Sequence, residues 1–176
     1  MKLEDLKGRI RNIPDFPIKG VIFRDITTLI SDPEAFKFTI DHLHDRYKDN
    51  KPDLIVGIES RGFIFGGALA DRLNIGFIPA RKPGKLPWKT VEESYELEYG
   101  KAALQIHSDA INKGQRILIL DDLLATGGTI GATVKLVERL GGIIEEIAII
   151  IELTFLKGRD KLQGKNIHSL VRYDSE

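Results

Sequence analysis

Cysteine is absent from this 176-residue chain. That absence excludes disulfide bonds, thiolate metal sites and a cysteine nucleophile. The four histidines do not take the place of thiolates as metal ligands, because His42 and His44 would point to different faces of a helix and the other two stand alone. We therefore expect no metal site built from protein side chains alone.

The chain also lacks an excess of charge of one sign. Lysine plus arginine number 26, and so do aspartate plus glutamate. No overall field therefore draws the protein to nucleic acid or to an anionic membrane, and an anion must be bound by a local cluster. No apolar run approaches the length of a membrane span, and residues 1–11 are charged, so we expect a cytoplasmic protein without membrane or nucleic-acid partners.

Apolar residues recur in patterns typical of alternating helices and strands. Asp32 and Pro33 have the residue types of an N-cap and a first helical turn. Helical spacing predicts helices over 3–10, 33–49, 62–73 and 128–140. Short apolar runs predict strands over 54–58, 76–78, 117–120 and 143–153. Parallel strands need crossover connections, which helices supply. We therefore predict one α/β domain over residues 1–176, with a mostly parallel twisted sheet flanked by helices.

Residues 81–100 do not fit this alternation. Pro83, Gly84 and Pro87 interrupt the segment, which also carries several lysines and glutamates. A loop of about 20 residues without secondary structure is uncommon in a compact domain unless it has a function. We therefore interpret this segment as a functional loop.

An acidic pair, Asp121 and Asp122, follows the strand predicted at 117–120. Ligands of open parallel sheets bind beyond the carboxyl ends of the strands, and two carboxylates there can accept hydrogen bonds from vicinal hydroxyls. The next residues open a helix, and their backbone N–H groups can approach a phosphate closely. This phosphate turn consists of Ala125, Thr126, Gly127, Gly128 and Thr129. A few of these residues taken alone would suit an ordinary turn, but the whole run predicts a site for a phosphorylated ribose.

The run from Leu120 to Thr129 resembles the signature with which type I phosphoribosyltransferases bind 5-phosphoribosyl-1-pyrophosphate (PRPP). The resemblance implies the type I phosphoribosyltransferase fold. It also implies a small N-terminal hood over the base site at residues 1–30 and a mobile catalytic loop at residues 81–100.

Residues 16–26 resemble the hood segment of the adenine phosphoribosyltransferase family, and with two further stretches they extend the resemblance over nearly the whole chain. The resemblance implies that Phe23 stacks on adenine, while the backbone at Ile22 and Arg24 reads the edge of the base. An aromatic face suits a purine ring. Spacing alone favours a core position for Phe23 instead.

Residues 57–63, the pyrophosphate loop, are similar to the segment that binds the leaving group in that family. By itself this short stretch is equally typical of a plain turn. The resemblance implies that Arg61 holds pyrophosphate with paired donors, and a strained non-proline peptide is expected near Ser60 and Arg61. The residues implied to bind pyrophosphate are Glu59, Ser60, Arg61, Gly62, Arg81, Lys82 and Lys85.

Residues 81–87 and 94–100 resemble the basic front and the Leu-Glu-Tyr-Gly close of the family's mobile loop. Charged segments of this kind are usually disordered loops exposed to solvent. The resemblance implies a catalytic role for Arg61, for Glu98 as general acid or base toward the purine, and for Tyr99 in closing the loop. A water molecule could perform the proton transfer in place of Glu98.

The reaction implied is purine salvage, in which adenine and PRPP give AMP and pyrophosphate. Mg²⁺ is implied as a cofactor bound mainly through the pyrophosphate substrate, because this ion sheds its water reluctantly. The resemblance also implies a homodimer.

Two alternatives keep the ribose-phosphate site. One is a phosphoribosyltransferase for xanthine, hypoxanthine or orotate, against which the hood segment argues, although reading a base by backbone groups constrains specificity weakly. The other is a regulatory sensor, for which the chain has neither spare length for a DNA-binding module nor a basic excess. A Walker-type loop would need a lysine that the phosphate turn lacks, and no Gly-x-Gly-x-x-Gly follows the first strand.

Overall fold

A five-stranded sheet forms the centre of the protein, whose computed structural model describes residues 1–96 and 100–176. The strand order is β4-β3-β7-β8-β9, and the neighbouring strands pair in parallel. The bounds are Gly76–Ala80 for β4, Leu54–Ile58 for β3, Arg116–Leu124 for β7, Ile143–Leu153 for β8 and Ile167–Tyr173 for β9. The predicted parallel sheet is confirmed, and β9 is an edge strand that the sequence patterns did not indicate.

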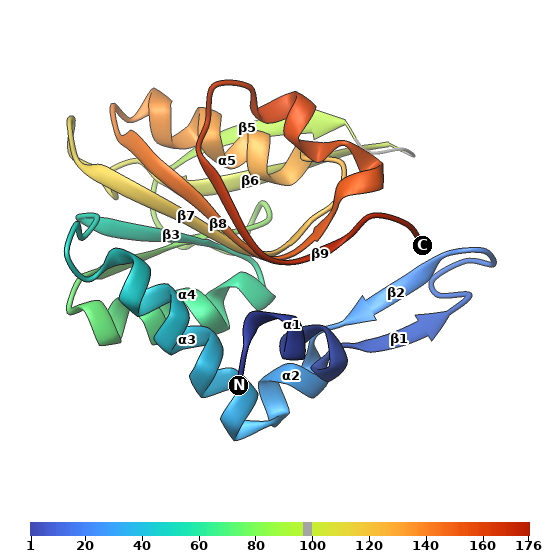
Figure 1. Ribbon diagram of the computed structural model, residues 1–176. Helices are drawn as coiled ribbons and strands as arrows, with labels where there is room; N and C mark the ends of the chain where they lie inside the picture. The colour runs from blue at the N-terminus through green and yellow to red at the C-terminus, as the bar shows by residue number, and fades with distance from the viewer. Residues whose placement is uncertain (97–99) are drawn as a thin grey trace.

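Helices cover both faces of this sheet (Figure 1). Helices α3 (Pro33–Tyr47) and α4 (Arg61–Leu73) pack on one face, and α5 (Gly128–Arg139) packs on the other. Alternate residues of β7 face opposite sides, so Leu118 and Leu120 belong to the core under α3 and α4 while Ile117 and Ile119 belong to the core under α5. Strands buried on both faces therefore read as continuous apolar runs.

Local signals set the helix ends close to where the sequence predicts them. The Asp32 side chain accepts hydrogen bonds from the backbone N–H groups of Glu34 and Ala35, which confirms the N-cap of α3. Helix α4 ends at Asn74, whose φ of 54° lies in the left-handed region. The predicted helix over 3–10 is shorter, because α1 (Leu3–Leu6) passes into the 3₁₀ helix η1 (Lys7–Arg9).

The N-terminal segment continues into an antiparallel hairpin, β1 (Arg11–Pro14) with β2 (Ile22–Asp25), followed by α2 (Thr27–Ser31). The hairpin projects beside the carboxyl ends of the central strands (Figure 1). Arg11 and Asp25 face each other across this hairpin, and Arg11 donates from Nε and Nη2 to Oδ2 of Asp25 at 3.1 and 2.6 Å. Asp25 also accepts from the hydroxyl of Thr27 at 2.6 Å and from its backbone N–H, and these two hydrogen bonds, together with that of Arg11, lower the pKa of Asp25 to about 2.

Residues 81–100 contain more regular structure than the sequence predicts. Strands β5 (Thr90–Glu96) and β6 (Lys101–His107) form an antiparallel hairpin on the α5 side of the sheet. The polar sequence of β5 gave no strand signal. Glu93 on β5 pairs with Lys135 at 3.0 Å and with Arg139, both on α5, and these distant partners stabilise the strand. The prediction of a structureless loop was therefore wrong for 90–96.

Two 3₁₀ helices, η2 (Thr154–Leu156) and η3 (Gly158–Leu162), connect β8 to β9. Buried Leu162 joins the core under α5, so this connection packs along that helix. Within residues 1–96 and 100–176, no helix is long and apolar enough to span a membrane.

Candidate active site

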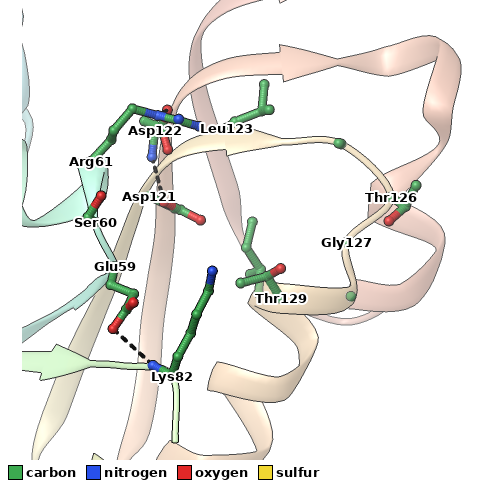
Figure 2. Close-up of a pocket in the computed structure, with 13 residues that line it drawn as sticks. Glu59, Ser60, Arg61, Lys82, Asp121, Asp122, Leu123, Thr126, Gly127 and Thr129 are labelled. Carbon is green, nitrogen blue, oxygen red and sulfur yellow. Dashed lines mark hydrogen bonds and ion pairs between the residues drawn. The ribbon is translucent and has the colours of Figure 1, made fainter. Parts of the chain in front are cut away.

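A cavity of about 380 Å³ lies at the carboxyl ends of β3 and β7. It brings together the acidic pair, the phosphate turn and part of the pyrophosphate loop, which are far apart in sequence (Figure 2). The lining residues are Glu59, Ser60, Arg61, Lys82, Asp121, Asp122, Leu123, Ala125, Thr126, Gly127, Gly128, Thr129 and Ile130. Leu123 belongs to the predicted run from Leu120 to Thr129 but was given no role of its own, and Ile130 was not predicted.

The acidic pair lies within β7, which extends to Leu124 rather than ending at residue 120 as predicted. Asp121 and Asp122 are only 7% and 6% exposed. Oδ1 of Asp121 accepts a hydrogen bond from the backbone N–H of Asp122 at 2.9 Å. Burial, and then the neighbouring Asp122 carboxylate, raise the pKa of Asp121 well above its ordinary value of 3.8. The pair therefore forms a buried acceptor site at the cavity wall.

The phosphate turn leads directly into α5, with Gly127 as the N-cap residue. Its φ of 78° lies in the left-handed region, which glycine adopts without strain. The Thr129 hydroxyl donates to Oη of Tyr95 at 3.3 Å, so β5 contacts the first turn of α5. The N-terminus of this helix faces the cavity, where its dipole and free N–H groups favour an anion.

The pyrophosphate loop joins β3 to α4, and Ser60 is the N-cap residue of that helix. The peptide between Glu59 and Ser60 is cis, one bond before the position where a non-proline distortion was expected. Gly62 is not a lining residue within the described part of the chain. A Cβ at Gly62 would lie 2.9 Å from the Leu120 carbonyl oxygen, so glycine here permits α4 to approach β7.

Arg61 extends from α4 toward the acidic pair. Its Nε donates to Oδ2 of Asp122 at 2.5 Å (Figure 2), and its guanidinium carbon lies 5.8 Å from the centre of the Phe23 ring. The side chain of Arg61 is 41% exposed, so the guanidinium also remains accessible from solvent. Arg61 thus connects the acidic pair to the hood.

Glu59 contacts the basic segment after β4. Its Oε2 accepts from Nε of Arg81 at 3.0 Å and from the backbone N–H of Lys82 at 2.9 Å (Figure 2). Glu59 therefore holds these two basic residues beside the cavity, and its own predicted part in binding pyrophosphate stays a prediction. Among the described residues, Lys82 lines the cavity whereas Arg81 and Lys85 do not.

The hood residues lie on β2, next to the cavity rather than in its lining as far as the described residues show. Phe23 is half-buried and packs edge-on against Phe16, with ring centres 5.2 Å apart, so it is not the core residue that spacing favoured. The Arg24 side chain turns away, donating to Oδ1 of Asn12 at 2.7 Å and stacking over the Tyr173 ring at 4.1 Å. The backbone of Ile22 and Arg24 remains the part implied to read a base.

Glu98 and Tyr99 lie outside the described residues, so their predicted roles stay predictions. Tyr95, in contrast, contacts Thr129 and packs against Gly128, where a Cβ would lie 3.1 Å from its ring. Tyr95 had no role predicted from the sequence. Its place in an alternating stretch of β5 was the signal that could have indicated an inward-facing residue.

Comparison with known proteins gives matches over nearly the whole chain. Residues 29–168 match the family model described as phosphoribosyl transferase domain. The adenine phosphoribosyltransferase of Chloroflexus aurantiacus is 54% identical over 173 residues, which cover 98% of this chain and all of that protein. That of Clostridium perfringens is 58% identical over 169 residues, covering 96% of this chain and 98% of the relative.

Solved structures give the same result. The crystal structure of adenine phosphoribosyltransferase from Thermoanaerobacter pseudethanolicus has a TM-score of 0.94 and 55% identity, covering 98% of this chain and 100% of that one. The Saccharomyces cerevisiae enzyme, solved with adenine and an imino-altritol bisphosphate, has a TM-score of 0.90 and 40% identity, covering 96% and 97%.

Proposed function

The chain belongs to the adenine phosphoribosyltransferase family, and we propose that the cavity between β3 and β7 performs the family's reaction with the residues described above. The enzyme joins adenine to the phosphoribosyl group of PRPP and releases pyrophosphate, giving AMP for purine salvage. The observation that carries the residue assignment is the single cavity wall on which the buried acidic pair meets the N-terminus of α5.

The acidic pair and the phosphate turn would hold the ribose 5-phosphate part of PRPP. The 5-phosphate suits the backbone N–H groups and hydroxyls of the turn, because these donors and the helix dipole are fixed before the ligand arrives. The vicinal ribose hydroxyls suit the acceptor oxygens of Asp121 and Asp122. With both ends of the sugar held, the anomeric carbon is directed toward the base and the leaving group.

The pyrophosphate loop and the basic residues after β4 would hold the leaving group. Negative charge grows on pyrophosphate as its bond to the anomeric carbon breaks, and Arg61 and Lys82 both line the cavity where this charge develops. Arg81 lies beside them through its contact with Glu59. Arg61 would exchange its present hydrogen bond to Asp122 for contacts with pyrophosphate when the ribose hydroxyls occupy the acidic pair.

Adenine would bind between the cavity and the hood. The ring of Phe23 lies 5.8 Å from the guanidinium carbon of Arg61, and this short distance supports Phe23 as the stacking surface. A ring nitrogen of adenine attacks the anomeric carbon as the bond to pyrophosphate breaks, and the base must then lose a proton. We propose Glu98 for that transfer and Tyr99 for closure of the catalytic loop.

Mg²⁺ fits this site as a cofactor carried mainly by the substrate. The acidic pair offers hard carboxylate oxygens, which this ion prefers, and within the described ranges no three acidic, histidine or cysteine side chains are grouped to hold a metal. When bound, Mg²⁺ supplies positive charge to the departing pyrophosphate. The homodimer and the cytoplasmic location expected from the sequence also belong to this proposal.

The experiment that tests the function is a comparison of bases. Purified protein is incubated with PRPP and Mg²⁺ and, separately, with adenine, hypoxanthine, guanine, xanthine or orotate, and the nucleotide formed is quantified. The proposal expects AMP from adenine, with little product from the other bases and a much slower reaction for Glu98→Ala. Preferential use of another base would overturn the assignment of the hood, and binding of PRPP without any product would favour a sensor.

A further inference from the structure

The phosphate turn is supported from outside the cavity by the connection between β8 and β9. A Cβ at Gly127 would lie 2.4 Å from the carbonyl oxygen of Gly158, the first residue of η3. A Cβ at Gly158 would lie 2.3 Å from the Ala125 carbonyl oxygen and 3.1 Å from the backbone nitrogen of Gly127. The two backbone segments are therefore in direct contact, and a shift of η3 must shift the turn.

Arg159 follows Gly158 and fixes η3 to the end of β8. Its Nε and Nη2 donate to the two carboxylate oxygens of Glu152 at 2.6 and 2.8 Å. The Ser169 hydroxyl on β9 donates to the same carboxylate at 2.6 Å. A bidentate pair of this kind defines an orientation as well as a distance, which a single-point contact would not.

Glu152 is 2% exposed, so its carboxylate depends on these donors. Burial alone would raise its pKa, but the hydrogen bonds from Arg159 and Ser169 reverse that effect and leave the pKa below its ordinary value. The carboxylate is therefore charged at neutral pH. Removing Arg159 would leave this buried charge with only Ser169 and the more distant Arg172, whose Nε lies 3.4 Å from Oε2, and η3 would lose its ion pair to β8.

We propose that Glu152 and Arg159 are positioning residues for PRPP, which hold Gly158 against the phosphate turn and so fix the donors that receive the 5-phosphate. The inference rests on the proposed function and adds residues that do not line the cavity. Among the residues that line the cavity in the described part of the chain, neither Glu152 nor Arg159 is found. Their effect passes through the backbone contact between Gly158 and the turn.

A purely structural role for the pair would lower the amount or stability of folded protein without changing the affinity of one substrate. A positioning role instead raises the KM for PRPP and leaves the KM for adenine close to its wild-type value. The chain offers a matched control on the same strand. Arg46 donates from Nε and Nη2 to Glu146 of β8, both at 2.6 Å, and this bidentate pair lies far from the cavity near the start of the strand.

The test compares Arg159→Gln with Arg46→Gln, using wild-type protein that forms AMP as the reference. Each variant is measured for its thermal midpoint and for its KM values for PRPP and adenine. We expect Arg159→Gln to raise the KM for PRPP roughly tenfold, the effect of about 1.4 kcal/mol in binding, while Arg46→Gln leaves both KM values unchanged. Equal KM values for PRPP in the two variants would overturn the proposal, even though the wild-type activity would stand.

A second variant reaches the turn without changing any charge. Gly158→Ala places a methyl group against the Ala125 carbonyl, whereas a Cβ at Gly67 on α4 would meet nothing within 4 Å. Gly158→Ala should weaken PRPP binding in the absence of base, measured by titration calorimetry, and Gly67→Ala should not. If Gly158→Ala binds PRPP with wild-type affinity, η3 does not shape the turn and the proposal fails.

Discussion

Nε of Arg61 donates to Oδ2 of Asp122 at 2.5 Å, so a cation predicted to bind pyrophosphate is paired with a carboxylate predicted to bind ribose. The contact crosses from α4 to β7 and neutralises both groups beside the cavity. PRPP offers a replacement partner to each, because its hydroxyls are donors and its pyrophosphate is an anion. Binding of substrate is therefore expected to separate the two side chains.

Asp122→Asn tests the carboxylate side of this exchange. The amide keeps the shape but loses the charge, so the hydrogen bonds to ribose weaken by about 1.5–3 kcal/mol. We expect kcat/KM for PRPP to fall roughly tenfold to a hundredfold. Steady-state kinetics checks this against Asp109→Asn, a change at an exposed aspartate. Equal kinetics for the two variants would exclude Asp122 from the substrate site.

Arg61→Gln tests the cationic side. Loss of the guanidinium removes a donor pair aimed at growing negative charge, and we expect kcat to fall on the order of a hundredfold. Arg61→Lys should restore little of the rate, because an ammonium group cannot donate in a planar pair. Arg72→Gln, at the other end of α4, is the control, since Arg72 pairs with Asp41 at 2.6 Å on the protein surface. A rate for Arg61→Gln near that of this control contradicts the assignment.

Phe23→Ala tests the stacking surface of the hood. Loss of an aromatic face under a base removes about 1–3 kcal/mol, so the KM for adenine should rise by roughly fivefold to a hundredfold while the KM for PRPP stays nearly constant. Trp88→Ala is the aromatic control, because that side chain is 63% exposed and has no assigned role. If Phe23→Ala changes the KM for PRPP and leaves the KM for adenine unchanged, Phe23 is not at the base site.

Asp121→Asn tests how much the buried negative charge of Asp121 destabilises the folded protein. A folded-state pKa above the ordinary value of 3.8 means that the native protein holds this proton more tightly than the unfolded chain. Stability is therefore lost as pH rises from the unfolded pKa through the folded one, and charged Asp121 destabilises the ligand-free protein above that window. The amide should raise the thermal midpoint at pH 7 by about 3 °C for each kcal/mol removed, while weakening PRPP binding.

The comparison that checks this is a pair of thermal scans at pH 7 and below pH 3.8. The gain in thermal midpoint of Asp121→Asn over wild type should shrink at the lower pH, where the unfolded carboxyl is protonated as well. If the gain in thermal midpoint is the same at both pH values, it comes from packing and not from removal of the charge.

Local patterns in the sequence were sufficient for the parts of the fold that depend on local physics. Apolar runs gave β3, β7 and β8, and Asp32 with Pro33 gave the start of α3. Strands β1, β2, β5, β6 and β9 were missed, because they are short or polar and depend on pairing and packing that no apolar run indicates. In the sequence, Glu93 is typical of a solvent-exposed charge, whereas in the structure it pairs with Lys135 and Arg139 of α5.

In the candidate site, too, features within one stretch of sequence were predicted and contacts between distant stretches were not. The phosphate turn is one continuous motif, so its residue types and spacing were enough to place it in the cavity. The pairing of Arg61 with Asp122 and the contact of Gly158 with Gly127 join segments from different elements, and no local pattern encodes either. Glu98 lies outside the described residues, so its role rests on the resemblance and on the kinetic test above.

A crystal structure of the protein with AMP tests the assignment of this cavity most directly. The 5-phosphate is expected at the N-terminus of α5, the ribose hydroxyls on Asp121 and Asp122, and the adenine ring against Phe23. AMP bound away from the phosphate turn, or with its base directed away from β2, would contradict the central claim that this cavity carries out the transfer.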